Sequence, residues 1–188
     1  MEPTPGPADE ALMLAVKGGQ VGKLAVLFER HNRAIFNFFY RMSGNRELSE
    51  DLVQDVFFRM LKYKDSYQEK ASFTAWMYQV ARSAQIDSFR KRKNEAQWND
   101  EQPEPASQDV RADERLTKRQ ELAILQKAMA ALPPEKREVL VMSRYQNLKY
   151  QEIGKILGCE ENAVKLRVFR AVRALGQIYN ELAGERAS

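Results

Sequence analysis

Apolar residues recur along this chain at steps of three and four, and this spacing constrains the fold more than any other feature. Such spacing places side chains on one face of an α-helix, whereas a half-buried β-strand needs strict alternation of apolar and polar residues. No stretch alternates with period two, and no internal repeat is evident. Hydrophobic residues make up 44% of the 188 residues, which is enough for packed cores. The pattern predicts an all-α fold class.

Four amphipathic stretches in the first half of the chain predict a helix bundle over residues 9–93. The first covers residues 9–17, and the second ends at residues 43–45, where a glycine follows a serine. Ser49 is the candidate N-cap of the third helix, and the fourth covers residues 73–93. The apolar face of the second and third stretches holds Leu24, Leu27, Phe28, His31, Ile35, Phe38, Met42, Leu52, Val53, Val56, Phe57, Met60 and Leu61.

The net charge changes sign twice along the chain. Residues 78–93 carry five bases against one acid, whereas residues 94–115 carry seven acids against two bases and include two prolines. Residues 135–175 carry nine bases against five acids. The overall formal charge of +4 is therefore a cancellation between two basic domains and an acidic segment. We predict that residues 94–115 form a flexible acidic linker.

A second small helical domain is predicted over residues 116–182. One helix over residues 116–132 ends at two prolines, which break helices, and another covers residues 135–145. A short helix then ends at Gly158, a residue that tolerates the positive φ of a tight turn, before a longer helix begins. This spacing predicts a helix-turn-helix. Its apolar residues are Ile153, Ile156 and Leu157 in the first helix and Val164, Val168, Ala171, Val172 and Leu175 in the second.

The outward face of that second helix carries the chemistry of major-groove recognition. Asn and Arg bind base edges bidentately, apolar groups contact thymine methyl groups, and Lys and Arg neutralise phosphates. A plain helical hairpin with a solvated basic face is the alternative, but the turn glycine, the spacing and the charge together favour DNA binding. The candidate residues are Asn162, Lys165, Leu166, Arg167, Phe169, Arg170 and Arg173.

Six aromatic residues lie between residues 63 and 89, beside the basic run at residues 90–93. Exposed rings beside cations suit single-stranded nucleic acid, because rings stack on bases while Arg and Lys follow the backbone. The alternative, rings in the core and a solvated basic helix end, stays open. On a helix numbered from Phe73, the spacing predicts that Phe73 and Trp76 face inward and that Tyr78, Arg82, Ile86 and Phe89 face outward.

Several kinds of site and segment have no support in the sequence. One cysteine, Cys159, and one histidine, His31, cannot supply a structural zinc site, so we expect no metal, no cofactor and no internal disulfide. No apolar run approaches the ~18 residues that cross a bilayer, and no secretory signal is visible, so we expect no membrane insertion and a cytoplasmic localisation. Residues 1–8 are predicted to be a disordered N-terminus and residues 183–188 a C-terminal tail.

Longer motifs resemble two regions of the extracytoplasmic-function branch of sigma-70-type sigma factors. Residues 51–59, DLVQDVFFR, and residues 71–82, ASFTAWMYQVAR, followed by Asp87 and the basic run, resemble region 2. Residues 132–140 and the helix-turn-helix resemble region 4. The resemblance implies a non-enzymatic transcription factor that binds core RNA polymerase, directs it to promoters and serves transcription regulation such as a stress response.

In this family the second helix of region 2 docks on the clamp helices of the polymerase β′ subunit. The resemblance therefore implies a core-binding surface on the outward side of the helix that contains residues 51–59. The alternative, that Asp55 and Arg59 merely form a surface ion pair at i and i+4, stays open. The implied core-binding residues are Asp51, Gln54, Asp55, Phe58 and Arg59.

The resemblance also implies that region 2 opens the minus-10 element and holds a flipped base, whose unstacking must be offset by contacts in the protein. Ser83 stands where many members of the family carry Asn, and its shorter reach leaves the identity of the flipped base open. The implied minus-10 residues are Tyr67, Phe73, Trp76, Tyr78, Arg82, Ser83, Ile86, Arg90 and Lys93.

Region 4 of the family reads the minus-35 element, which adds Glu161 to the candidate residues of the recognition helix. A carboxylate there can accept a hydrogen bond from cytosine N4. The implied partners are promoter DNA, core RNA polymerase through its β′ clamp helices and β flap, and an anti-sigma factor. The main rival is a stand-alone helix-turn-helix regulator with a helical sensor or dimerisation lobe, and a more distant one is a helical adaptor for an acidic protein.

Overall fold

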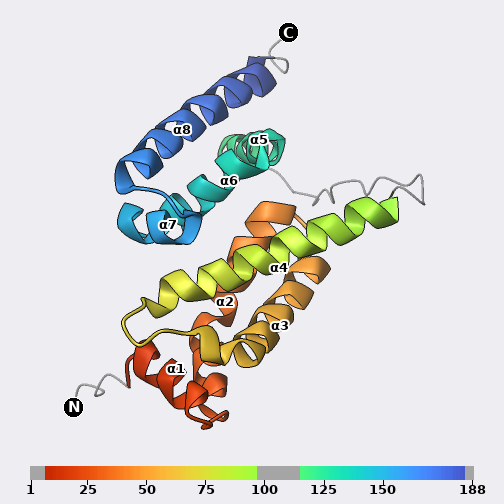
Figure 1. The fold of residues 1–188 in the computed structure, drawn as a ribbon. Helices are drawn as coiled ribbons and strands as arrows, with labels where there is room; N and C mark the ends of the chain where they lie inside the picture. Colours follow the sequence, from red (N-terminus) through yellow and green to blue (C-terminus); the bar gives the residue numbers. More distant parts are fainter. Residues whose placement is uncertain (1–6, 97–114, 185–188) are drawn as a thin grey trace, which may run out of the picture. The chain divides into compact units, whose positions relative to one another are not determined.

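A computed structural model describes residues 7–96 and 115–184, with the side chains of residues 7–92 and 120–184. These residues form eight α-helices, one 3-10 turn and one π turn, and no strand occurs in these two ranges (Figure 1). The predicted all-α fold is confirmed. The chain divides into two compact units, which are described separately below. The parts of the predicted N-terminus, acidic linker and C-terminal tail at residues 1–6, 97–114 and 185–188 lie outside the described residues.

The first unit is a bundle of four helices around one apolar core. Its elements are α1 (Asp9–Lys17), α2 (Lys23–Ser43), α3 (Arg46–Lys62), the 3-10 turn η1 (Lys64–Ser66) and α4 (Phe73–Ala96). Helices α3 and α4 lie side by side (Figure 1). Full burial of a Val, Leu, Ile, Phe or Met side chain contributes about 1.5–3 kcal/mol to folding. The core holds Leu12, Met13, Val16, Leu27, Ile35, Phe38, Phe39, Leu52, Val53, Val56, Met60, Phe73 and Met77.

The connection between α2 and α3 confirms one predicted boundary and corrects another. Helix α2 ends at Ser43, and Gly44 adopts φ +70°, a left-handed conformation that costs glycine little. Helix α3 already begins at Arg46, one turn before the predicted N-cap, so Ser49 is a buried residue inside the helix. An ion pair of 2.9 Å between Arg46 and Glu50 at i and i+4 supports this added turn.

Two aromatic residues of the first unit lie on a different side from the one that spacing predicts. Tyr78 is only 3% exposed, so the prediction that it faces outward is wrong. The ring of Tyr78 packs edge to face on the ring of Phe38 in α2. Helix α2 therefore covers a side of α4 that the spacing from Phe73 predicts to be exposed. Phe28 is 41% exposed although it belongs to the apolar stripe of α2, and its ring contacts Phe57 at a centroid distance of 4.9 Å.

The second unit packs three helices against one long helix, and a π turn lies against two of the three. Its elements are α5 (Arg115–Ala131), α6 (Pro134–Leu140), the π turn η2 (Val141–Tyr145), α7 (Tyr150–Leu157) and α8 (Glu161–Gly184). Helix α8 runs along α5, α6 and α7 (Figure 1). The core holds Ala128, Met129, Leu132, Val139, Leu140, Val141, Met142, Ile153, Ile156, Val164, Val168 and Ala171.

The helix predicted over residues 135–145 is two elements in the structure. The α-helical hydrogen bonds end at Leu140, and the chain continues as the wider π turn. The backbone N–H of Gln146 donates to the carbonyl of Val141 at 3.0 Å, an i to i−5 bond that closes this turn. Pro134 occupies the first position of α6, where its missing N–H costs nothing.

The helix-turn-helix of α7 and α8 is confirmed. Gly158 follows α7 with φ +65°, as the turn requires. Gly154 is a second required glycine, because a Cβ at this position would meet the carbonyl oxygen of Cys159 at 2.6 Å. Val172 is 45% exposed, so its predicted place in the core is wrong. The buried stripe of α8 is narrower than predicted: Val164, Val168 and Ala171 are buried, whereas Leu175 is only half-buried.

Candidate nucleic-acid interface

The outward face of α8 is continuous and fully accessible within its unit. All eight residues predicted for this face are exposed, and two of them are apolar, Leu166 at 48% and Phe169 at 64% exposure. Val172 extends the apolar row by one more turn, which the sequence analysis missed. The exposed residues are Glu161, Asn162, Lys165, Leu166, Arg167, Phe169, Arg170 and Arg173. This face combines amide, guanidinium and apolar groups, as major-groove recognition requires.

One ion pair reduces the positive charge of this face. The Nζ atom of Lys165 lies 3.0 Å from Oε1 of Glu161, one helical turn before it, and both side chains are about half exposed. Glu161 begins α8, where a carboxylate also interacts favourably with the positive end of the helix dipole. In the free protein the Glu161 carboxylate therefore interacts with Lys165 and with the N-terminal end of α8.

On α4, a second exposed row lies at helical spacing. Ser83, Ile86 and Arg90 point to solvent on one face, together with Asp87, and Phe89 beside them is 47% exposed. Arg82 is half-buried, and the side chain of Lys93 lies outside the described side chains. The row carries a hydroxyl, an apolar group and a guanidinium next to one carboxylate. Asp87 belongs to the motif that resembles region 2, but it was not predicted as a site residue.

Three of the aromatic rings predicted to hold a flipped base are part of the core. Tyr67 and Phe73 are fully buried and Tyr78 nearly so, because α1 and α2 cover them, and in this structure their faces are not available for stacking. Burial, with the nearby carboxylates of Glu10 and Asp9, raises the pKa of Tyr67 to about 12. Burial also raises the pKa of Tyr78. Trp76 is half-buried, with its ring 5.2 Å from that of Tyr67.

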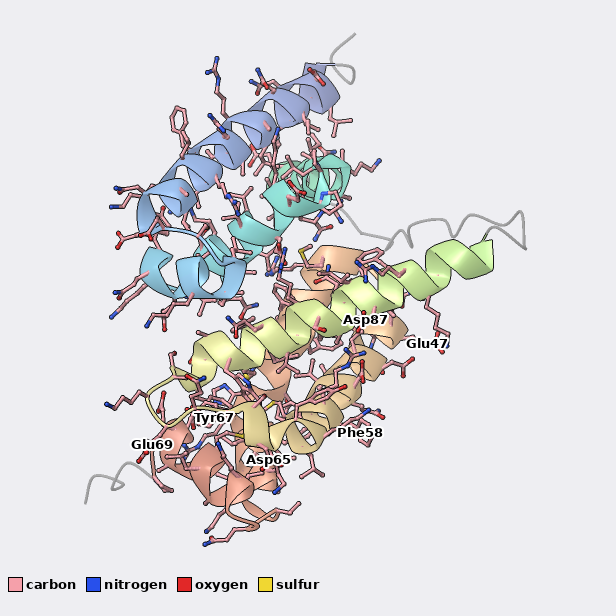
Figure 2. The ribbon with its side chains drawn as sticks, in the orientation of Figure 1. Glu47, Phe58, Asp65, Tyr67, Glu69 and Asp87 are labelled. Atoms are coloured by element: carbon pink, nitrogen blue, oxygen red, sulfur yellow. The ribbon has the colours of Figure 1, made fainter. Side chains whose placement is uncertain are left out.

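Helix α1 holds the segment between η1 and α4 in place. Lys17 donates to the carbonyl of Tyr67 at 2.7 Å, and Lys64 donates to the carbonyl of Lys17 at 3.1 Å. Glu10 accepts the backbone N–H of Phe73 at 3.2 Å, at the start of α4. Figure 2 shows Tyr67 in this segment. Lys17, Lys64 and Glu10 were not among the predicted site residues, and the acidic pair at the start of α1 was the signal in the sequence that pointed to this contact.

Helix α3 presents an exposed aromatic ring on the side where the core-binding residues were predicted. Phe58 is 64% exposed, and Figure 2 shows its side chain pointing away from α4. Asp51 and Gln54 are exposed on the same helix. A large exposed ring between polar neighbours is a candidate for a protein contact, since aromatic side chains are enriched in the cores of such interfaces.

Arg59, the remaining core-binding candidate, makes its contacts inside the unit. Its Nε atom lies 2.9 Å from Oδ2 of Asp55, which confirms the predicted i and i+4 pair. Its Nη1 atom reaches across to α4 and lies 2.6 Å from Oδ2 of Asp87. Burial opposes the charge of the guanidinium, but the hydrogen bonds that it donates to both carboxylates, together with their negative charges, outweigh burial and raise the pKa of Arg59. The side chain is only 21% exposed.

Both units match regions of one protein family. Residues 27–95 match Sigma-70 region 2, and residues 122–175 match Sigma-70, region 4. The ECF RNA polymerase sigma factor SigM of Bacillus subtilis is 30% identical over 155 residues, which cover 82% of this chain and 93% of SigM. The chain belongs to the extracytoplasmic-function (ECF) RNA polymerase sigma factors. The resemblance found in the sequence is confirmed, and the stand-alone regulator is not favoured.

Further relatives agree on the family and the fold. The ECF RNA polymerase sigma factor SigE of Mycolicibacterium smegmatis is 30% identical over 168 residues; the match covers 86% of this sigma factor and 63% of SigE. A solved structure of the sigma factor RpoE in complex with the anti-sigma factor NepR, from Bartonella quintana, shares the fold with a TM-score of 0.67 at 23% identity. That match covers 83% of this chain and 96% of RpoE.

In this sigma factor the region 2 match begins after α1, so the helix that holds the segment before α4 lies outside the matched span. The region 4 match contains α7 and the part of α8 up to Leu175. Among the described residues, no group of three or more His, Cys, Asp and Glu side chains is placed to hold a metal ion. None of the helices that the structure describes is long and apolar enough to span a bilayer.

Proposed function

We propose that this sigma factor binds core RNA polymerase and directs it to promoters with minus-35 and minus-10 elements, where it opens the DNA. The observation that carries the proposal is the pairing of two exposed nucleic-acid-like surfaces, on α4 and on α8, with matches to regions 2 and 4 of the family. It acts by placement and catalyses no reaction. Because its partner polymerase works in the cytoplasm, we place the protein there.

For the minus-35 element we propose the exposed face of α8. Asn162 and Arg170 supply bidentate groups for base edges, and Phe169 supplies an apolar surface for a thymine methyl group. Arg167 and Arg173 on the flanks are suited to phosphates. We keep the predicted domain limits, residues 9–93 and 116–182, as part of this proposal.

For the minus-10 element we propose the row of Ser83, Ile86 and Arg90, with Trp76 as the ring that remains partly accessible for a base. Arg82 and Lys93 remain in the predicted set. Tyr67, Phe73 and Tyr78 act from the core by fixing the segment before α4, since their rings are buried. One partly exposed ring and flanking cations are consistent with a single unstacked base.

For the polymerase we propose that Asp51, Gln54 and Phe58 of α3 meet the β′ clamp helices, with Asp55 at the edge of the contact. Region 4 would meet the β flap. An anti-sigma factor is a further proposed partner, supported by the partner named for the RpoE structure. Phe58 is the large apolar side chain that the free protein leaves exposed on this helix.

Run-off transcription with purified core polymerase tests the proposal. The intact holoenzyme should give a promoter-specific product and permanganate-reactive thymines, and this protein without core should give neither. A stand-alone regulator would bind duplex DNA without such reactivity and would overturn the proposal.

Arg170→Ala separates the two surfaces in the same assay. We expect it to reduce initiation from minus-35-dependent promoters by roughly tenfold or more, since a bidentate base contact contributes about 1–3 kcal/mol. Arg170→Ala should not change the affinity for core polymerase. Phe58→Ala should weaken the binding of core polymerase and leave the binding of duplex DNA intact. Arg33→Ala, an exposed arginine on α2, is the charge-matched control. Loss of core binding in Arg170→Ala would contradict the assignment.

A further inference from the structure

A single guanidinium connects the polymerase-facing helix to the DNA-facing helix of the first unit. The side chain of Arg59 extends from α3 to α4, where its Nη1 atom lies 2.6 Å from Oδ2 of Asp87 and 3.4 Å from Oγ of Ser83. Asp87 lies within the exposed row formed by Ser83, Ile86 and Arg90, and Figure 2 marks its position on α4. Arg59 therefore reaches the proposed minus-10 surface from the neighbouring helix.

The charge on Asp87 matters because the proposed ligand is a polyanion. Its side chain is 49% exposed, and an unpaired carboxylate at this place would repel the DNA backbone. Arg59 cancels that charge through a short ion pair. Its guanidinium is held at the other end by Asp55 at 2.9 Å, so its position is fixed by two carboxylates on two helices.

The same guanidinium sets the direction of the Ser83 hydroxyl. Arginine has only donor groups, so Ser83 Oγ accepts from Arg59, and the hydroxyl hydrogen points elsewhere. Since Ser83 is exposed, that hydrogen is available to an acceptor on a base. A serine oriented in this way favours a base edge that presents an acceptor.

We propose that Arg59 is a positioning residue of the minus-10 surface, which neutralises Asp87 and orients Ser83 as a donor, rather than a direct contact to polymerase. The inference rests on the proposed function. It reassigns a side chain predicted for the core-binding surface, and the 21% exposure of Arg59 against 64% for the adjacent Phe58 supports the reassignment.

The main test uses holoenzymes made with four variants of Arg59 and Asp87 and a fluorescent single-stranded oligonucleotide of the non-template minus-10 sequence. Arg59→Ala leaves Asp87 unpaired and should weaken oligonucleotide binding roughly tenfold, with a shallower salt dependence. Asp87→Asn frees the guanidinium and should strengthen binding roughly threefold. The double variant, Arg59→Ala with Asp87→Asn, should bind the oligonucleotide about as tightly as the wild type. Arg59→Lys keeps the positive charge and should also bind like the wild type.

Core affinity, measured separately, should change less than about twofold in all four variants. Arg46→Ala is the matched control, since it removes another α3 arginine paired at i and i+4. It should leave oligonucleotide binding unchanged. Ser83→Ala should weaken binding in the wild-type background and have a smaller effect beside Arg59→Ala, where the hydroxyl has lost its orientation.

Three results would overturn the inference. Failure of Asp87→Asn to restore binding to Arg59→Ala would show that charge neutralisation is not the role. A loss of core affinity that accounts for the whole Arg59→Ala defect would show a direct polymerase contact. If Arg59→Ala and Asp87→Asn lose thermal stability equally, and the salt dependence of oligonucleotide binding does not change, the bridge has a purely structural role. A wild-type holoenzyme that does not bind the oligonucleotide would instead overturn the proposed function.

Discussion

Single side chains control how much positive charge each surface of this sigma factor offers to DNA. On α8, Lys165 is paired with Glu161 at 3.0 Å. On α4, Asp87 is paired with a guanidinium from α3. In both cases a carboxylate lies on a surface proposed to bind a polyanion, so the free protein holds part of its charge in internal pairs. Such pairs lower non-specific affinity more than they add stability.

Replacing Glu161 by Gln should release Lys165 for a phosphate contact. We expect affinity for duplex DNA of unrelated sequence to rise roughly threefold at low salt, with a steeper salt dependence by about one counterion. Fluorescence anisotropy over a range of salt concentrations would measure both. Glu121→Gln, which changes an exposed carboxylate on α5, is the control. If Glu161 reads a cytosine, the same variant will instead lose affinity for the cognate minus-35 element alone.

Tyr67 makes stability depend on alkaline pH. The pKa of its phenol is raised to about 12 by burial and by the carboxylates of Glu10 and Asp9, whereas in the unfolded chain it is about 10. Because the folded state resists ionisation, the free energy of unfolding falls as pH rises through this window, by about 1.4 kcal/mol per pH unit at most. Below this window, at neutral pH, the stabilisation is complete.

Tyr67→Phe should therefore flatten the loss of stability between about pH 10 and pH 12. At neutral pH it should cost about 1 kcal/mol, because the hydroxyl donates to the carbonyl of Ala71 at 2.9 Å. Urea unfolding at neutral pH and near pH 11 would measure both effects. Tyr63→Phe, an exposed tyrosine at 49%, is the control and should change neither value. An unchanged alkaline slope in Tyr67→Phe would contradict the account.

At the scale of elements, close backbone approaches fix the recognition helix. The backbone N–H of Cys159 donates to the carbonyl of Gly154 at 2.9 Å, and this bond closes the turn between α7 and α8. The space beside Gly154 is filled by backbone, which cannot move without displacing the start of α8. The orientation of the side chains proposed to contact DNA therefore depends on a residue outside that exposed face.

Gly154→Ala should destabilise the second unit by about 1–3 kcal/mol, because the added methyl group overlaps the Cys159 carbonyl oxygen. Binding to minus-35 duplex should fall in parallel, while core binding through the first unit should persist. Thermal unfolding would measure the loss of stability, and fluorescence anisotropy would measure the binding of minus-35 duplex. Gly176→Ala is the control, since a Cβ there has no neighbour within 4 Å. Full stability in Gly154→Ala would contradict the close approach.

At the scale of the whole molecule, we expect the proposed function to require both units in one chain. Each unit has its own core and its own exposed surface. Two DNA contacts on one chain raise the effective concentration of the second contact once the first has formed. The acidic segment between them carries negative charge that DNA will not bind, so it connects the units without competing for the same surfaces.

Separating the units should abolish this advantage. A mixture of residues 1–96 and 115–188 at micromolar concentration should support run-off transcription at least roughly 100-fold less well than the intact chain, because tethering supplies effective concentrations near millimolar. Circular dichroism should show that both fragments remain helical, which serves as the control. Equal activity of the mixture would show that the tether contributes nothing to promoter binding.

Apolar periodicity, turn residues and charge order determined much of this protein without a structure. The all-α class, the end of α2 at Ser43, the turn at Gly158 and the exposed face of α8 follow from local chemistry, because helix spacing and glycine conformation act over a few residues. The α8 candidates were predictable because a solvated helix face is what remains after the buried stripe of the same helix is assigned.

Only the tertiary structure decided what covers each remaining face. Tyr78 is buried because Phe38 of α2 packs on it, and Gly154 is required because the backbone of Cys159 passes beside it. The bridge from Arg59 to Asp87 joins residues 28 positions apart. A single-helix pattern cannot show such contacts, since each depends on how two elements pack. The sequence thus determined the helices and their charge, and packing determined which side chains remain available to DNA and polymerase.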